Sequence, residues 1–330
     1  MRAVVITRPG GPDVLEMRDV PRPDPGPGEI RVRVHATAVN RADLLQRVGG
    51  YPAPAGVPRE IPGLEYAGVV DTTGAGTRRW SPGDRVMGLV GGGSYAEYVV
   101  THEDEAIAIP ANLSFEEAAA VPEAFITAHD ALYTQMRLAE GETLLVHAVG
   151  SGVGTAALQL AKARGARVIG TQRSAWKLER AEALGLDVAI ETGSDVDADS
   201  FVNTVMEATD GTGVHGVLDL IGGPWLAANV RVLRTRGRIL LVGLVAGSTC
   251  ELDLRRVLQK RATIIGTVLR ARPLTEKIEV ARRFADDVVP LLGDGRVRPV
   301  MDAVLPLEHA AQAHTMVQDN RNFGKVVLRC

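Results

Sequence analysis

The chain has 330 residues, of which 45% are hydrophobic and 23% charged, so it is long enough for two domains with cores of ordinary size. Its formal net charge of −3 and its pI of about 6.2 give no general attraction for nucleic acid or anionic membrane. Two cysteines, Cys250 and Cys330, are too few for a disulfide framework or a C-x-x-C metal site. No signal peptide is visible and no apolar run approaches ~20 residues, so we expect a globular cytoplasmic protein with no membrane partner.

The first third of the chain has short β-like runs that are interrupted by clusters of proline and glycine, such as PRPDPGPGE. This punctuation is typical of a small, twisted, mostly antiparallel barrel. A helical pattern then covers residues 123–136, and we place a domain boundary after residue 122. The expected strands are residues 3–6, 30–38, 67–71, 85–89 and 94–100.

The stretch TLLVHAVGSGVGTAALQL (residues 143–160) has the order strand, glycine turn, helix. Glycines let the backbone approach a ligand closely, and the first N–H groups of a helix attract a phosphate. The spacing departs from the strict G-x-G-x-x-G fingerprint, because Val149 and Ser151 stand where its first two glycines belong. The turn therefore favours a nucleotide site without proving one, since such turns are often only turns.

Alternating strands and helices continue to residue 266 and support the nucleotide interpretation. The strands are short runs of Val, Ile and Leu without period-two alternation, which predicts a parallel sheet buried on both faces in a doubly wound α/β (Rossmann) domain, residues 123–266. A further helix–strand–helix–strand segment, residues 267–330, is expected to fold back onto residues 1–122. The later strands are predicted at residues 167–170, 188–190, 214–220, 238–242, 262–266, 300–305 and 324–328, and the helices at 175–184, 200–209, 224–233, 252–259, 274–292 and 307–319.

This layout and several motifs resemble the zinc-free quinone oxidoreductases of the medium-chain dehydrogenase/reductase superfamily. The resemblance is nearest to the tumour-suppressor-inducible group and more distant to zeta-crystallin. It implies a chaperonin-10-like (GroES-like) barrel beside the Rossmann domain, an NADPH cofactor, a small quinone or conjugated carbonyl substrate, and a homodimer or larger homo-oligomer. The motifs are NRADLLQRVGGY (40–51), IPGLEYAGVV (61–70), PGDRVMGL (82–89), GGGSYAEYV (91–99), AAAVPEAFITAHDAL (118–132), SGVGTAALQLA (151–161) and NRNFGKVVL (320–328).

The same resemblance implies that no metal takes part. Zinc enzymes of the superfamily have a cysteine where NRAD begins here, and their G-H-E histidine is replaced by Leu64. A catalytic zinc needs three protein ligands of Cys, His or carboxylate type, and leucine cannot be one. The four-cysteine structural lobe is also missing, while Glu65 is left as a structural acceptor near the nicotinamide pocket.

Cofactor choice depends on the end of the second strand of the Rossmann domain, GTQRSAWK. No carboxylate is present there for a ribose 2′-OH, and Arg173, Ser174 and Lys177 can hold a 2′-phosphate, which predicts NADPH. A solvated loop with two cations is the alternative. A family tyrosine that stacks on adenine is replaced by Thr192, which weakens the NADPH preference. By resemblance, the remaining cofactor contacts are Thr127, Ser151, Gly152, Val153, Gly154, Gly243 and Asn322.

On the substrate side, the resemblance implies catalytic roles for Asn40 and Tyr51. Asn40 alternatively only caps a helix that begins at Arg41, and Tyr51 is alternatively an ordinary loop aromatic. Because a hydroquinone is acidic enough to take its proton from water, we expect no obligatory proton donor. The predicted activity is NADPH-dependent quinone reduction. The alternatives are reduction of an activated carbon–carbon double bond, as in enone and enoyl reductases, and a crystallin-like protein that binds nucleotide without catalysis; nucleic acid is not expected as a partner.

Overall fold

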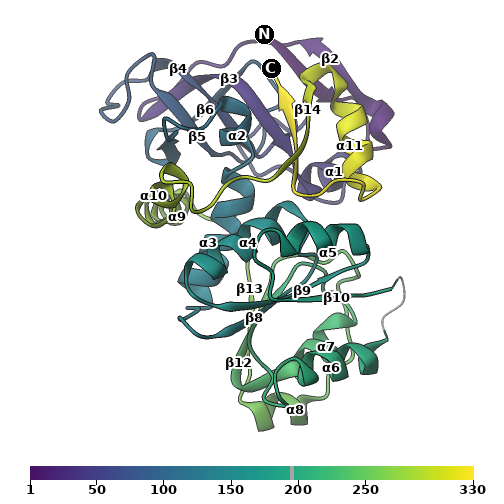
Figure 1. Cartoon of the computed structure of the whole chain (residues 1–330). Coiled ribbons are helices and arrows are strands. Elements are labelled where there is room, and N and C mark those ends of the chain that lie inside the picture. The colour runs from purple at the N-terminus through teal and green to yellow at the C-terminus, as the bar shows by residue number, and fades with distance from the viewer. Residues whose placement is uncertain (194–196) are drawn as a thin grey trace. The chain divides into compact units, whose positions relative to one another are not determined.

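The computed structural model describes residues 1–193 and 197–330 (Figure 1). The chain forms two compact units: the first contains Met1–Ile126 and Leu269–Cys330, and the second contains Thr127–Val268. The expected boundaries, after residues 122 and 266, lie a few residues before these. The second unit is thus an insertion within the first.

The first unit is built on a seven-stranded mixed sheet in which β6 pairs with β3 beside the main row of strands. All of its pairings are antiparallel except that of β14 with β15. The punctuated sequence thus forms an antiparallel sheet, as expected. The order is β14 (Met301–Pro306), β15 (Lys325–Arg329), β3 (Glu29–Val39), β4 (Glu65–Thr73), β5 (Arg85–Leu89) and β7 (Ala106–Ala108), with β6 at Tyr98–His102.

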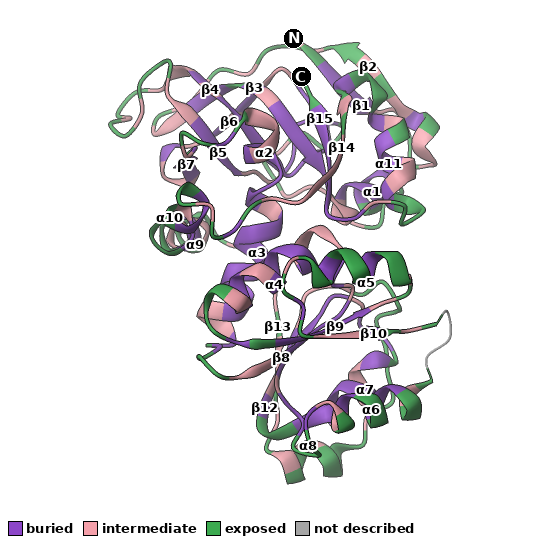
Figure 2. Ribbon diagram, viewed as in Figure 1, coloured by how far each residue is buried: buried purple, intermediate pink, exposed green. Residues whose placement is uncertain are grey.

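Short helices and a two-stranded ribbon complete this unit, and Figure 2 shows its strands largely buried. One apolar core lies between β3, β4, β5 and β6 and contains Ile30, Val32 and Tyr66, while another joins β1 and β15 to α11. The additional elements are β1 (Arg2–Ile6), η1 (Pro12–Val14), β2 (Leu15–Asp19), α1 (Arg41–Arg47), η2 (Glu103–Glu105), α2 (Phe115–Ala119), η3 (Pro122–Ile126), α9 (Leu274–Asp287), α10 (Val289–Gly293), η5 (Leu307–His309) and α11 (Ala310–Gln318).

The second unit is a six-stranded sheet in which every pairing is parallel. In order of appearance its strands are arranged 3-2-1-4-5-6, the order of a dinucleotide-binding Rossmann sheet. The predicted α/β fold class is therefore confirmed. The sheet runs β10 (Val188–Glu191), β9 (Arg167–Gln172), β8 (Thr143–Val146), β11 (Val214–Asp219), β12 (Leu233–Leu241) and β13 (Thr263–Gly266).

Helices cover both faces of this sheet (Figure 1). On one face lie α4 (Gly152–Ala163) and α5 (Ala175–Glu182), and on the other α6 (Ala198–Glu207), α7 (Trp225–Val232) and α8 (Leu254–Lys260). Phe201 and Trp225 pack edge to face, with ring centroids 5.1 Å apart, in the core between the sheet and the second set of helices. The central strands β8, β9 and β11 are largely buried, which explains their apolar runs, whereas β12 contains exposed arginines in its first half.

The structure corrects two helix predictions and adds two strands. Residues 274–292 form two helices, because Pro290 has no N–H to continue the hydrogen-bond ladder, and the break falls at Val288. Residues 123–136 are helical, but π-helical turns at Pro122–Ile126 and Asp130–Gln135 flank a single α-turn. Periodicity cannot distinguish these hydrogen-bond patterns. The strands β2 and β7 were not predicted, because LEMRD has little apolar content and β7 is only three residues long.

Candidate active site

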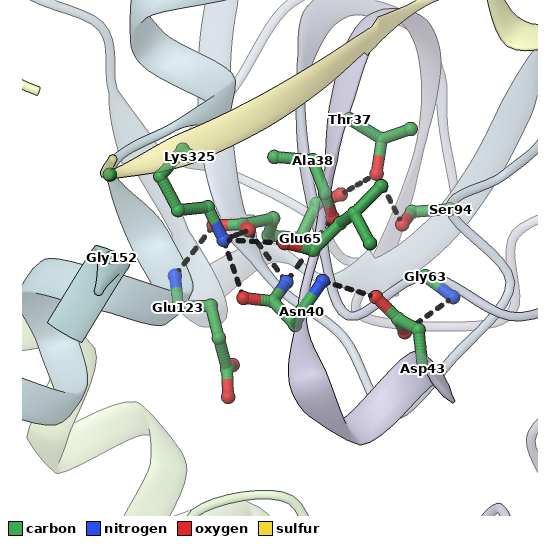
Figure 3. Close-up of polar contacts among 12 residues, drawn as sticks. Thr37, Ala38, Asn40, Asp43, Gly63, Glu65, Ser94, Glu123, Gly152 and Lys325 are labelled. Atoms are coloured by element: carbon green, nitrogen blue, oxygen red, sulfur yellow. Dashed lines mark hydrogen bonds and ion pairs between the residues drawn. The ribbon is translucent and has the colours of Figure 1, made fainter. Parts of the chain in front are cut away.

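A buried polar cluster in the first unit is centred on Glu65, the second residue after the glycine of the IPGLEY motif (Figure 3). Its carboxylate is fully buried and accepts hydrogen bonds from the Asn40 amide (2.7 Å), the Lys325 ammonium (2.7 Å) and the Glu123 backbone N–H (2.7 Å). Both carboxylate oxygens of Glu65 therefore accept at least one hydrogen bond, as a buried carboxylate requires. Strands β4 and β15 supply the ion pair from distant parts of the chain.

Asn40 is the N-cap residue of α1, immediately before Arg41, and its side chain is directed into this cluster. The backbone N–H of Asn40 donates to the Asp43 carboxylate (2.8 Å), while its amide oxygen accepts from Lys325 (2.5 Å) and its NH₂ group donates to Glu65 and to the Ala38 carbonyl (3.2 Å). Asn40 thus caps α1 in a capping box with Asp43, as the capping alternative predicted, and its amide in addition joins the buried cluster. Figure 3 shows it between Glu65 and Asp43.

Asp43 extends the cluster away from Glu65. It is fully buried and accepts from the Gly63 N–H (3.1 Å) and from the Tyr95 hydroxyl (3.3 Å), and burial raises its pKa to about 6. The Tyr95 hydroxyl also contacts the His314 ring (3.1 Å), whose other nitrogen faces Arg47 (3.2 Å). Burial, followed by the Arg47 charge, lowers the pKa of His314 to about 3, so that ring is a neutral core histidine.

Tyr51 lies in the loop after α1 and is held by Arg270. The guanidinium lies 5.0 Å from the centre of the Tyr51 ring and also donates to the Tyr51 carbonyl (3.2 Å), the Gly91 carbonyl (2.7 Å) and the Gln46 amide oxygen (2.5 Å). Burial raises the pKa of Tyr51 and lowers that of Arg270. The cation over the ring and one hydrogen bond to its backbone hold Tyr51, and the other two hydrogen bonds hold Arg270 in place.

The glycine turn of the second unit lies at the carboxyl end of β8, and its geometry explains its sequence. The Ser151 hydroxyl caps α4 by accepting from the Gly154 N–H (3.0 Å). A Cβ at Gly154 would lie 2.4 Å from the Ala148 carbonyl oxygen, so only glycine fits. Gly152 and Val153 are in the first helical turn, where N–H groups have no intrahelical partner and can receive a phosphate.

A buried chain of hydrogen bonds begins at His147, directly after β8 and before the glycine turn. Because the Asp219 carboxylate only accepts, Asn229 donates to it (3.0 Å), and the Asn229 oxygen then faces the His147 Nε2 atom (2.7 Å). The Nδ1 atom of His147 contacts the Thr171 hydroxyl (2.8 Å), and burial lowers the pKa of the ring. Asp219 also accepts from the backbone N–H groups of residues 221 and 222. Three adjacent strand ends are thereby tied together.

The residues predicted to select NADPH lie after β9, and they differ in exposure. Arg173 is exposed, and Ser174 is the N-cap residue of α5, immediately before Ala175. Lys177 is 5% exposed, with its ammonium 5.3 Å from the Trp176 ring centre. Arg173 is thus the more accessible of the two cations. Thr192, which stands where the family tyrosine was expected, follows β10.

The other predicted cofactor residues are divided between the two units. Thr127 opens α3 (Thr127–His129) and is buried, and Gly243 follows β12, where a Cβ would lie 2.4 Å from the Leu220 carbonyl oxygen. Asn322 belongs to the first unit, as Asn40 and Tyr51 do, and donates to the Gly324 carbonyl (2.7 Å). These positions leave the predicted roles as predictions.

Sequence reasoning missed Lys325, Glu123 and the Asp219–Asn229–His147 chain. Lys325 lies inside the quoted NRNFGKVVL motif, and a lysine in an apolar strand was the one available signal for a buried ion pair. Across the described ranges, no group of three or more His, Cys, Asp or Glu side chains is arranged to hold a metal ion. No helix in those ranges is long and apolar enough to cross a membrane.

Two family models match the chain. The alcohol dehydrogenase GroES-like domain matches residues 26–111, and the zinc-binding dehydrogenase domain matches residues 152–286. A quinone oxidoreductase of Pseudomonas aeruginosa is 35% identical over 97% of this chain and 96% of its own length. Together with the strand order, the two models define a medium-chain dehydrogenase/reductase.

Solved structures agree with this class. A mycobacterial structure complexed with NADPH has a TM-score of 0.91 at 30% identity, and an NAD-dependent alcohol dehydrogenase has 0.87 at 36%; each alignment covers both chains fully. The CurK enoyl reductase has 0.85 at 26% identity, covering 99% of this chain and 98% of its own. Within the superfamily, the chain belongs to the quinone oxidoreductase family, as the motifs predicted, and its relatives are of the zeta-crystallin-like group; the nearer resemblance to the tumour-suppressor-inducible group stays a prediction.

Proposed function

We propose that the chain is an NADPH-dependent quinone oxidoreductase that works without zinc. The observation that carries the proposal is the Tyr51 ring: Arg270 lies over it and donates to the Tyr51 carbonyl, and Arg270 is itself anchored to Gly91 and Gln46, so a flat apolar acceptor has a fixed aromatic plane to stack on. Membership of an oxidoreductase family supplies the reaction type, and the site supplies the acceptor class.

The residues after β9 support NADPH over NADH. QRS at residues 172–174 offers no carboxylate to a ribose 2′-OH, and exposed Arg173 offers a guanidinium to a 2′-phosphate. The solved relatives include both an NADPH complex and a structure named as NAD-dependent, so the choice depends on these residues of the chain itself.

The cofactor would be held by the first turn of α4, where Ser151 fixes the Gly154 N–H and the Gly152 and Val153 N–H groups face outward for a pyrophosphate. NADPH when bound supplies the hydride. The chain's own residues position the acceptor: Tyr51 by stacking and Asn40 by an amide whose orientation Glu65 and Lys325 fix. The Glu65 site is neutralised by Lys325, so it needs no cation from solution.

Steady-state oxidation of NADPH and NADH against a panel of quinones, enones and enoyl thioesters tests the proposal. We expect the highest kcat/KM with NADPH and a quinone. Higher kcat/KM with an enoyl thioester would favour the second candidate, an enoyl reductase, which the structural likeness to CurK supports. Cofactor binding without turnover of any acceptor would contradict both and indicate a nucleotide-binding protein.

A further inference from the structure

A small cavity in the first unit lies beside Arg270 and has a volume of about 30 Å³. Most of its wall is apolar, formed by residues such as Leu64, Ile126 and Leu269, and three charged groups besides Arg270 line it: Glu123, Glu105 and Lys277. The volume suffices for a water molecule or a substrate oxygen, but it is too small for a ring.

Glu105 and Lys277 neutralise each other at 3.2 Å, whereas the carboxylate of Glu123 has no hydrogen bond or ion pair to any residue in the described parts of the chain. Only its backbone N–H is used, by Glu65. Figure 3 shows the Glu123 carboxylate turned away from Glu65 and Lys325. Glu123 is partly buried, and an acidic group that is removed from much of the solvent and has no partner is less stable as an anion than as a neutral acid.

The surrounding charges act in the same direction. Burial is the largest cause, and together with the negative charges of Glu65 and Asp43 it outweighs Lys325 and Arg270, which raises the pKa of Glu123 to about 8. The remaining charged groups on the cavity wall, Glu105 and Lys277, compensate each other. At neutral pH the carboxyl is therefore predominantly protonated and can donate.

We propose that Glu123 is a further catalytic residue, the acid that donates a proton from this cavity to the oxygen of a reduced α,β-unsaturated ketone. The inference rests on the proposed NADPH-dependent activity and extends it to acceptors that quinone chemistry does not cover. Quinones do not need such a donor, because a hydroquinone anion is only weakly basic. An enolate is far more basic, so protonation limits its formation.

The atoms balance as follows for the enone. A hydride from the dihydronicotinamide forms a C–H bond at the β-carbon. The π pair of the carbon–carbon double bond shifts to the bond between the α-carbon and the carbonyl carbon, and the π pair of the carbonyl moves to its oxygen. The Glu123 O–H bond breaks as an O–H bond forms on that oxygen, which gives an enol that becomes the ketone. The Glu123 carboxylate then takes a proton from water.

The test compares wild type, Glu123→Gln and Glu123→Asp with one enone and one quinone across pH. The acid donates only when protonated, so wild-type kcat for the enone should fall as pH rises through about 8. Glu123→Gln should lower that kcat by ~10²-fold or more and remove the pH dependence, with quinone turnover near wild type. Glu123→Asp keeps an acid and should keep the pH dependence at reduced kcat, and it replaces the Gln variant if that variant does not fold.

A readout without turnover separates this inference from the proposed function. In infrared difference spectra, a carbonyl band of a protonated carboxylic acid should be present at pH 6.5, vanish well above pH 8, and be absent in Glu123→Gln. The double variant Glu105→Gln, Lys277→Gln is the matched control, because it removes a compensating pair from the wall of the same cavity and should leave both the band and the pH dependence.

Three results would overturn the inference: no band of this kind, equal loss of quinone and enone turnover in Glu123→Gln, or a wild type that reduces quinones but no enone. A wild type that oxidises NADPH with neither acceptor contradicts the proposed function, and the proton-donor role falls with it even if the band is seen.

Discussion

Lys325 shows at the scale of a single residue how the first unit tolerates a buried charge. Its side chain is 5% exposed, and its ammonium neutralises the fully buried Glu65. Removing one partner of a buried pair leaves the other charge unpaired, at a cost of about 3–5 kcal/mol. We expect Lys325→Met to lower the stability of β3 and β4 by that amount, measured by native-state hydrogen exchange.

The matched control for that variant is Arg329→Met on the same strand. Arg329 pairs with Glu116 at 2.8 Å, but its side chain is 64% exposed. Its loss should therefore change the free energy of opening, measured by the same hydrogen exchange, by less than about 1 kcal/mol. Equal effects of the two variants would show that the buried pair contributes no more than a surface pair. Adding Glu65→Gln to Lys325→Met should recover part of the loss.

Tyr51 tests whether the acceptor is held by stacking or by a hydroxyl. We expect Tyr51→Phe to keep kcat for quinone, because the ring still lies over Arg270, and Tyr51→Ala to raise KM. A fall in kcat of ~10²-fold or more with Phe would instead identify the hydroxyl as an electrophilic donor.

Asn40 tests a separate contact with the acceptor. We expect Asn40→Ala to lower kcat/KM for quinone while NADPH affinity is unchanged. If NADPH affinity falls by the same factor as kcat/KM, Asn40 belongs to the cofactor site or to the fold instead.

At the scale of an element, the loop between β9 and α5 should select the cofactor. Charge-assisted hydrogen bonds contribute about 1.5–3 kcal/mol each, so Arg173→Ala should lower the kcat/KM ratio of NADPH to NADH by ~10-fold or more, and adding Lys177→Ala should bring the shift to at least ~10²-fold. Because Lys177 is buried, we expect Arg173 to contribute the larger share. Arg255→Ala, at an exposed site on α8, controls for the loss of charge. An unchanged ratio would assign recognition elsewhere.

The elements also show what sequence reasoning can and cannot reach. Val-, Ile- and Leu-rich runs predicted the six parallel strands, since burial of the central strands leaves few polar positions. Pairings such as Lys325 with Glu65 are 260 residues apart in the chain and leave no local pattern. Likewise, the sequence correctly predicts that Asn40 caps a helix, but the additional contacts of its amide with Glu65 on β4 and Lys325 on β15 leave no local pattern.

At the scale of the whole molecule, we expect turnover to be independent of metal. Leu64 stands in the G-L-E segment beside Glu65, whose charge Lys325 already compensates. Purified enzyme should contain substoichiometric zinc and retain its quinone reductase rate after treatment with a chelator. Stoichiometric zinc whose removal abolishes the rate, and whose return restores it, would contradict this expectation.

The insertion of the second unit within the first has a consequence for synthesis on the ribosome. Domains usually fold in the order of the chain as it emerges. Here the central sheet of residues 127–268 is complete while the first unit still lacks β14 and β15, and β15 pairs directly with β3. The ion pair between Glu65 and Lys325 therefore cannot form until nearly the whole chain has been translated. We expect the second unit to fold before the first unit is complete. Until β14 and β15 have been synthesised, the N-terminal strands of the first unit are then exposed to chaperones.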